Sequence, residues 1–146
     1  MKNRYKMKQK VQQIKTPSDA VALFRAAMPK EQKEERVFVL PLDGNGKVLA
    51  KPILVSVGHV DGIAEIDAGA IFREALKVGA EEIIVAHNHP SGDLTPSKAD
   101  VDATKKLREA AQLLGVKFLD HLIVGSSDSS DGTGSTSLAE MWGEMA

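Results

Sequence analysis

Apolar and polar positions change period several times along the chain, and each change predicts a helix or a strand. Thr16 and Pro17 are typical of a helix start, because a threonine cap and a first-turn proline suit the unpaired N–H groups there. Helical spacing then places four apolar residues on one face, namely Ala20, Leu23, Phe24 and Ala27. Pro29 ends this helix, and a charged linker follows at 31–36.

Two apolar runs after the linker predict a pair of strands, at 37–42 and 48–57. The Asp-Gly-Asn-Gly sequence between them, at 43–46, is typical of a hairpin turn. Pro52 has no backbone N–H to donate, so it favours an edge position or a bulge for the second strand.

A second helix is predicted at 68–78, with Asp67 as its N-terminal cap and Gly79 at its end. Its inward positions are expected to be Ile71, Phe72, Ala75 and Leu76. The short run at 83–86 is fully apolar, which is typical of a strand buried on both faces. The polar residues that follow this strand are therefore expected at an edge of the sheet.

A third helix is predicted from about 96 to 114, capped by Thr95 and ended by Gly115. Residues 116–124 predict another strand, and the Ser/Gly/Asp-rich stretch 126–137 predicts a mobile loop. The interleaved elements indicate an α/β (α+β) fold: a single domain in which helices pack on both faces of a mixed sheet.

Composition limits the class of protein. The chain has 146 residues, of which 42% are hydrophobic and 27% are charged, as in an ordinary globular domain. It has no cysteine, which excludes disulfides and thiolate metal sites. The chain shows neither a secretory leader nor an apolar stretch long enough to cross a membrane. A cytoplasmic protein without a membrane partner is expected.

The net charge of −1 is unevenly distributed. Residues 1–15 carry six cations and no acid, whereas residues 16–146 carry 13 basic and 20 acidic side chains. We therefore expect a flexible basic arm at 1–15 and a folded domain at 16–146. An acidic domain repels a phosphate backbone, so a solubilising tail is favoured over a nucleic-acid-binding arm.

Candidate chemistry is concentrated in one pattern, H-x-H-P-x₆-S-x-x-D, formed by His87, His89, Pro90, Ser97 and Asp100. Residues two apart on a strand point to the same side, so the two imidazoles can converge on one point. Two imidazoles and a carboxylate are a ligand set suited to Zn²⁺, with the fourth tetrahedral position left for water. The pattern therefore favours one catalytic Zn²⁺ per chain and a hydrolytic reaction.

Simpler interpretations exist for each part of this pattern. The histidines would form a hydrogen-bonded pair at a turn, and Ser97 and Asp100 would form a helix capping box. Against the second interpretation, Thr95 already supplies a predicted cap. Asp100 also extends an inward stripe that contains Thr104, Leu107, Ala111 and Leu114. A carboxylate that faces inward needs a partner, and a metal ion would be one.

Residues 87–93, taken with the motif serine and aspartate, resemble the JAB/MPN (JAMM motif) metalloprotease superfamily, specifically its bacterial RadC-like branch. Further matching positions are Thr95, Pro96 and Thr104. Residues 120–125 resemble the strand after the metal helix of that branch, and the similarity runs from about 35 to 138. The resemblance implies a fold similar to that of cytidine deaminases and a Zn²⁺ bound by His87, His89 and Asp100.

The resemblance also implies the catalytic groups. Glu35, directly before the first strand, matches the general base, and Ser97 matches the serine that stabilises the oxyanion. Glu34 is the alternative base, because a slip of one residue turns a side chain to the other face. Glu81 fits badly, since it begins the strand whose far end carries His87, roughly 20 Å away at about 3.3 Å per residue.

Two functions remain open at this stage. The first is a zinc-dependent metallopeptidase or isopeptidase acting on a protein or peptide substrate. The second is a DNA-repair-associated RadC-like protein that binds metal without peptidase activity. Direct DNA binding has thin support, because the domain is acidic, aromatic residues make up 4% and no helix-hairpin-helix is predicted. Nucleoside deamination is rejected, because it needs zinc-binding cysteines or their equivalent.

Overall fold

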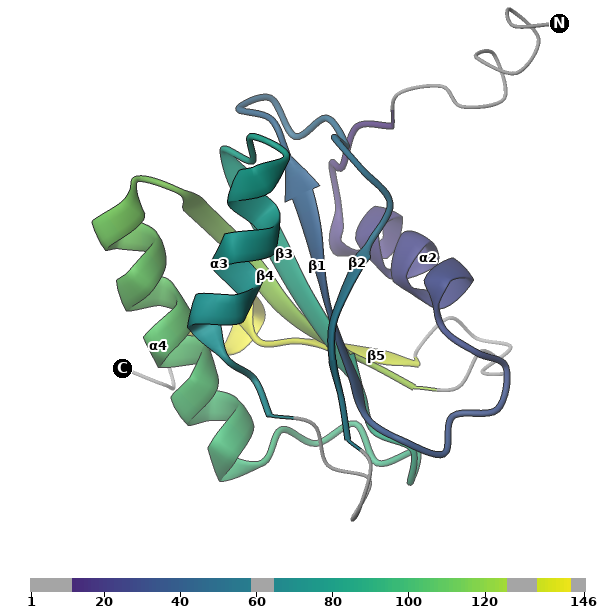
Figure 1. The fold of residues 1–146 in the computed structure, drawn as a ribbon. Helices are drawn as coiled ribbons and strands as arrows, with labels where there is room; N and C mark the ends of the chain where they lie inside the picture. The colour runs from purple at the N-terminus through teal and green to yellow at the C-terminus, as the bar shows by residue number, and fades with distance from the viewer. Residues whose placement is uncertain (1–11, 59–64, 126–133, 143–146) are drawn as a thin grey trace, which may run out of the picture.

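The computed structural model describes residues 12–58, 65–125 and 134–142. Within them one five-stranded sheet has the order β2-β1-β3-β4-β5 (Figure 1). Neighbouring strands are antiparallel except β3 and β4, which are parallel, so the sheet is mixed. The strands are β1 Arg36–Leu42, β2 Ile53–Val57, β3 Glu82–Asn88, β4 Lys117–Val124 and β5 Ser135–Ser137. The predicted single α+β domain is confirmed.

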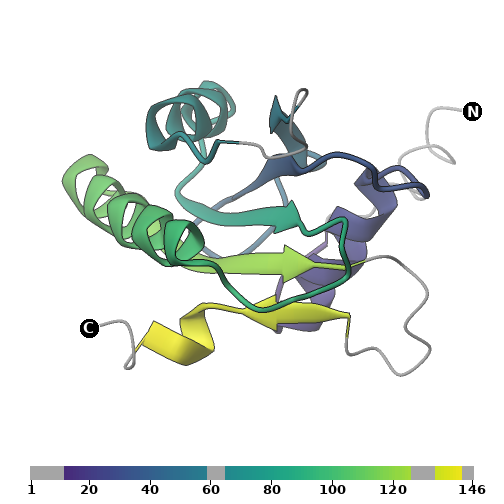
Figure 2. The same ribbon diagram turned by 90° about the horizontal axis from the view of Figure 1, so that it is seen from below.

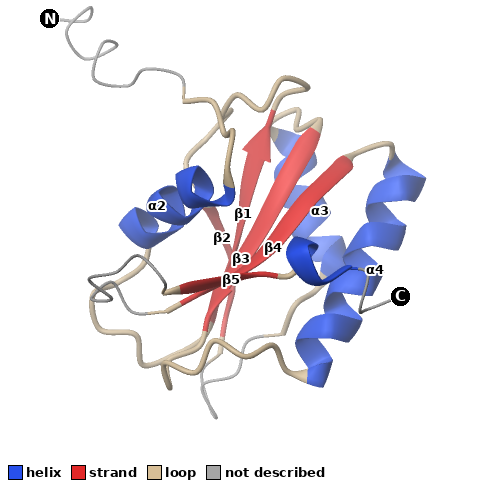
Figure 3. Ribbon diagram, turned by 180° about the vertical axis from the view of Figure 1, so that it is seen from behind, coloured by secondary structure: helices blue, strands red, loops and turns tan. Residues whose placement is uncertain are grey.

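Helices cover both faces of the sheet. Helices α3 (Ala68–Lys77) and α4 (Lys98–Leu114) lie on one face, and α2 (Pro17–Ala27) lies on the other (Figures 1 to 3). Parallel strands need a long crossover connection, and α4 provides it between β3 and β4. The chain that leaves the end of β3 therefore leads directly into α4, which brings the two halves of the histidine-aspartate motif together.

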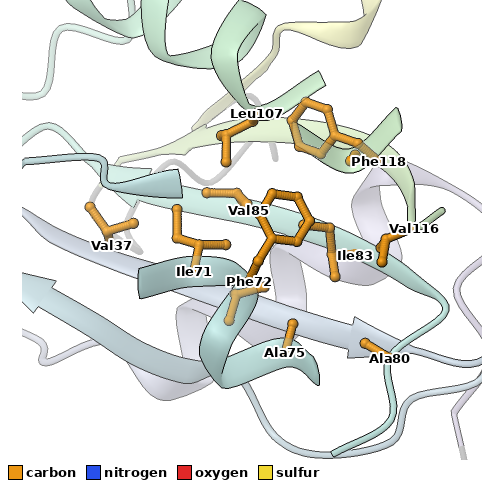
Figure 4. Close-up of a cluster of buried hydrophobic side chains, with 12 residues drawn as sticks. Val37, Ile71, Phe72, Ala75, Ala80, Ile83, Val85, Leu107, Val116 and Phe118 are labelled. Atoms are coloured by element: carbon orange, nitrogen blue, oxygen red, sulfur yellow. The ribbon is translucent and has the colours of Figure 1, made fainter. Parts of the chain in front are cut away.

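Strand β3 contributes alternate residues to two separate cores, as its uninterrupted apolar run predicted. Ile83 and Val85 pack with side chains of α3 and α4 in one cluster (Figure 4). Ile84 and Ala86 pack with α2 in the other cluster. Because side chains alternate along a strand, the next residue, His87, faces the side of α3 and α4.

The hairpin after β1 forms as predicted, but the second strand is shorter. The Asp43 carboxylate accepts the N–H groups of Asn45 and Lys47 and holds the turn. Val48 makes only an isolated bridge to Leu42, and regular β2 pairing begins at Ile53. Strand β2 is an edge strand, as the proline before it indicated.

The helices confirm most of the predicted caps and bounds, but some predicted inward positions are wrong. Asp67 caps α3 through the N–H groups of Gly69 and Ala70. Leu76 of α3 and Leu114 of α4 were expected to face inward, but they are 45% and 50% exposed. Both lie in the last turn of their helix. The apolar stripe predicts which face of a helix is buried, but not how far along the helix the sheet covers it.

The start of α4 differs from the prediction. The helix begins at Lys98 with Ser97 as its cap, not at Pro96 with Thr95 as its cap. The Ser97 hydroxyl accepts the Asp100 N–H, and the Asp100 carboxylate accepts the Ser97 N–H. Two otherwise unpaired N–H groups are satisfied by this reciprocal pair, whereas the Thr95 N–H is bound by Asp93 in the preceding turn.

The predicted mobile loop is wrong over its last residues. Residues 126–133 lie outside the described part of the chain, but Ser135–Ser137 forms β5 and pairs with β4. The buried Asp120 carboxylate anchors this segment, because it accepts the Ser137 hydroxyl and the Ala139 N–H. Burial raises the pKa of Asp120, although these hydrogen bonds act in the opposite direction.

The described end of the predicted basic arm contacts the domain. Ile14 donates its N–H to Gly46, and Gln12 accepts the N–H of Val48. Ile14 also packs against the core on the α2 side. Residues 1–11 lie outside the described ranges, and the boundary at residue 15 stays a prediction. No helix in the described ranges has the length and apolar character needed to cross a membrane.

The contacts of Ile14 predict that the last residues of the arm contribute to stability. Ile14→Ala should lower the free energy of unfolding by about 1–2 kcal/mol, because a partly buried side chain is truncated. Gln12→Ala, at an exposed neighbour, should change it by less than about 0.5 kcal/mol. Urea unfolding of both variants tests this, and equal stability of the two would contradict it.

Candidate metal centre

Three side chains converge where β3 ends and α4 begins. The Nε2 atoms of His87 and His89 are 3.0 Å apart. One carboxylate oxygen of Asp100 lies 3.2 Å from Nε2 of His87, and the other lies 3.2 Å from Nε2 of His89. The structure thus brings together the three residues that the sequence motif predicted as metal ligands.

The local sequence explains this convergence. His87 and His89 are two apart at the end of β3, so their rings leave the backbone on the same side. A turn follows, in which the Gly92 N–H donates to the His89 carbonyl. Gly92 has φ of +86°, in the left-handed region that favours glycine. The turn redirects the chain, and the first helical turn of α4 brings Asp100 to the two imidazoles.

Hydrogen bonds away from the cluster set the protonation of His89. Its Nδ1 lies 2.7 Å from the carbonyl oxygen of Asp93. A carbonyl can only accept, so Nδ1 of His89 carries the proton and donates it. The Nε2 atom of the neutral ring therefore presents a lone pair to His87 and Asp100.

A buried chain of hydrogen bonds from Thr104 through His121, called the relay below, also places the proton of His87 on Nδ1. The Thr104 hydroxyl donates to the Asp100 carbonyl, so its oxygen accepts from Nδ1 of His121, 2.7 Å away. Burial lowers the pKa of His121 well below its usual value. A neutral His121 then has only a lone pair at Nε2, which accepts from Nδ1 of His87 at 2.8 Å. The remaining lone pair of His87 is on Nε2.

When both rings are neutral, the atoms that face one another are therefore all electron-pair donors. The two imidazole Nε2 atoms lie 3.0 Å apart, and each lies 3.2 Å from a different oxygen of the Asp100 carboxylate. Such groups repel one another unless a cation lies among them. Zinc bonds of 2.0–2.2 Å in a tetrahedron place neighbouring ligand atoms about 3.3–3.6 Å apart, close to these separations. The donor set and its spacing fit a metal ion.

Asp100 serves the helix and the cluster at once. The oxygen that faces His89 also accepts the Ser97 N–H at 2.9 Å. Burial alone would raise the pKa of Asp100, but the hydrogen bond and positive charge of His87 in its protonated form, together with the Ser97 N–H, hold that pKa well below its usual value. The carboxylate is therefore ionised at neutral pH. Cap and candidate ligand, treated as alternatives from the sequence, are two roles of one side chain.

Two residues of the cluster, His89 and Asp100, line a cleft of about 980 Å³. Ser97 also lines this cleft, as does Glu35, from the segment before β1. Glu34, the alternative base, is not among the lining residues. The structure thus places Glu35 and Ser97 at the same cleft as two of the predicted ligands, His89 and Asp100, while their catalytic roles stay predictions.

Two residues of this region were given no role by the sequence. His121 lies inside an apolar strand, and its ring is fully buried against His87. Asn88 lies between the two motif histidines and is also buried. A polar residue within a buried run was the available signal for both, since such groups need partners. The identity of those partners depends on segments distant in the sequence.

Comparison with known proteins decides the family. A family model described as the RadC-like JAB domain matches residues 14–141. The chain belongs to this family. A UPF0758 protein of Carboxydothermus hydrogenoformans is 47% identical over 96 residues, which cover 66% of this chain and 42% of the relative. A UPF0758 protein of Geotalea uraniireducens is 36% identical over 125 residues, which cover 84% of this chain and 54% of the relative. The chain spans about half the length of these relatives.

For this RadC-like JAB domain, variants separate the two roles of Asp100. Asp100→Asn should lower Zn²⁺ affinity by more than the roughly 10–100-fold typical of losing a partner outside the ligand set. Ser97→Ala should leave Zn²⁺ affinity within a few-fold and lower stability by about 1 kcal/mol, because a helix cap is lost. Thr95→Ala, at the cap expected from sequence, should change neither. Chelator competition measures the change in Zn²⁺ affinity, and thermal unfolding measures the change in stability. Full metal retention by Asp100→Asn would exclude Asp100 as a ligand.

The relay makes a separate prediction for the RadC-like JAB domain. His121→Phe keeps an aromatic ring but removes the acceptor for Nδ1 of His87, so Zn²⁺ affinity should fall about 10–100-fold. Leu122→Val, at the next buried position of β4, is the control for packing and should leave the affinity nearly unchanged. In the metal-free protein, ¹⁵N NMR should show Nδ1 protonated in His87 and His89. Protonation at Nε2 in the neutral rings would contradict the relay.

Proposed function

We propose that this domain is a zinc-dependent metallopeptidase or isopeptidase acting on a protein or peptide substrate. One observation carries the proposal: His89 and Asp100, which form a cluster with His87, line a cleft that Glu35 and Ser97 also line. Hydrolysis of an amide needs an activated water, a group that moves its proton and a donor for the oxyanion. Residues suited to each need meet at one place.

The choice of Zn²⁺ rests on the donor set. Two neutral imidazole nitrogens and one carboxylate are the ligands typical of catalytic zinc sites, which keep one position open. When bound, Zn²⁺ supplies a Lewis acid that lowers the pKa of a water and polarises the scissile carbonyl. Hydrogen bonds from the rings to Asp93 and His121 would orient the two imidazoles for this role.

The chain's own residues would supply the remaining chemistry. Glu35 would take the proton of the attacking water and pass it to the leaving amine. The Ser97 hydroxyl accepts the Asp100 N–H, and this bond does not use its own proton. The hydroxyl can therefore donate to the oxyanion that develops on the carbonyl oxygen of the scissile amide. Its place at the helix N-terminus adds a favourable dipole for that negative charge.

The charge of the cleft favours a peptide over a nucleic acid. Its acidic lining residues are Glu35, Glu65, Asp93, Asp100 and Asp102. Lys33 and Lys106 are the lysines that line it within the described part of the chain. Carboxylates repel phosphates, so this lining supports the hydrolase proposal and gives no support to the DNA-associated alternative.

The assignment of the base is testable on a panel of fluorogenic peptides and isopeptide-linked substrates. Glu35→Gln keeps the shape of the side chain and removes the proton acceptor, so turnover should fall roughly 10²–10⁴-fold. Bound Zn²⁺ should stay at the wild-type level. Glu34→Gln is the matched control, and its turnover should stay near the wild-type value.

Two outcomes would contradict the proposal. Near-normal turnover of Glu35→Gln would exclude Glu35 as base and make Glu34 the next residue to test. A zinc-loaded wild-type protein that cleaves no substrate of the panel would count against peptidase activity itself. Ser97→Ala should retain Zn²⁺ and lose turnover by a smaller factor than Glu35→Gln, since it removes one oxyanion donor.

A further inference from the structure

Asn88 is a buried polar residue between the two motif histidines, and the proposed chemistry does not use it. Its exposed fraction is 1%. Because side chains alternate along β3, Asn88 points away from the face that carries the rings of His87 and His89. A buried side-chain amide needs hydrogen-bond partners, and those of Asn88 lie more than fifty residues away in sequence.

The partners are the two peptide groups on either side of Glu35. The Asn88 Oδ1 atom accepts the Arg36 N–H at 2.7 Å, and Nδ2 donates to the Glu34 carbonyl at 3.0 Å. A backbone N–H only donates and a carbonyl only accepts, so these two bonds fix which end of the amide is oxygen. Nδ2 also lies 3.3 Å from the side-chain oxygen of Gln32.

These bonds constrain the backbone at Glu35. The Glu34 carbonyl belongs to the peptide group before Glu35, and the Arg36 N–H belongs to the one after it. Holding both peptide planes restricts φ and ψ of the residue between them, and so the direction in which its side chain leaves the chain. The Glu35 carbonyl, in addition, accepts the Gly58 N–H at 3.0 Å.

We propose that Asn88 is a positioning residue, which fixes Glu35 relative to the cluster formed by its own neighbours His87 and His89. This inference rests on the proposed function of Glu35. One strand end then carries two predicted ligands on one face and, on the other, the clamp for the predicted base. The distance from base to cluster is then set by His87, Asn88 and His89, and does not depend on the conformation of the linker before β1.

An amide suits this role better than related side chains. Aspartate can accept the Arg36 N–H, but it has no donor for the Glu34 carbonyl. Leucine has nearly the same size and provides neither group, which leaves both backbone partners unpaired in a buried place. The two replacements therefore remove one bond or both bonds of the clamp while the histidines stay in the sequence.

The experiment uses Asn88→Asp and Asn88→Leu in the full chain. Both should bind Zn²⁺ within about threefold of wild type, because no predicted ligand is changed. Amide exchange of Arg36, followed by NMR, should accelerate at least about tenfold in Asn88→Leu and less in Asn88→Asp, which keeps its acceptor. Turnover should fall about 10–100-fold in Asn88→Leu with KM within about threefold, as expected for a displaced catalytic group.

Ile84→Val is the matched control. Ile84 lies on the same strand and the same buried face as Asn88, but packs in the core on the α2 side. The substitution should lower stability modestly and leave Arg36 exchange, Zn²⁺ affinity and turnover near wild type. If Asn88→Leu does not fold, Asn88→Asp decides: Arg36 exchange faster than in wild type at unchanged Zn²⁺ affinity supports the clamp, and wild-type exchange overturns it.

The outcomes separate this inference from the proposed function. Unchanged Arg36 exchange in Asn88→Leu overturns the clamp, whether or not a substrate is cleaved. A fall in Zn²⁺ affinity parallel to the loss of turnover also overturns it, because Asn88 would then act on the ligands. Faster Arg36 exchange at unchanged Zn²⁺ affinity supports the clamp even if the wild type cleaves none of the panel, a result that would count only against the peptidase proposal.

Discussion

With both histidine rings neutral, two imidazole nitrogens 3.0 Å apart each present a lone pair toward an Asp100 oxygen 3.2 Å away, and this is possible because the ring protons are held elsewhere. The ring protons of the two histidines are directed to the Asp93 carbonyl and to His121. If either ring rotated or changed tautomer, a donor would turn toward the cluster and the arrangement would become an ordinary hydrogen bond. The candidate metal centre thus depends on buried partners as much as on the ligands themselves.

Residues at the start of α4 also have more than one role. Asp100 holds the first turn of the helix through Ser97 and completes the donor set, and Thr104 connects the helix backbone to His121. Helix, strand β4 and cluster are therefore joined by one set of hydrogen bonds. A change in the helix start alters the site directly, since the cap and the candidate ligand are the same carboxylate.

Strand β3 organises the region through its alternation. Before its end, alternate residues of the strand pack into two different cores. At the end of the strand, the same alternation places His87 and Asn88 on opposite faces. One face then carries the cluster, and the other holds the backbone around Glu35. A rigid central strand is well suited to this task, because its position is determined by neighbours on both sides in the sheet.

Local pattern in the sequence was sufficient for the helices, the four longer strands, the mixed sheet and the three residues of the cluster, because periodicity and short spacing encode them. It misplaced the cap of α4, where Thr95 and Ser97 were both suitable and only the contacts of Asp100 distinguish them. It also missed β5, His121 and Asn88. Their roles depend on partners 17 to 56 residues away, and no periodic signal encodes a hydrogen bond between segments that only the tertiary structure brings together.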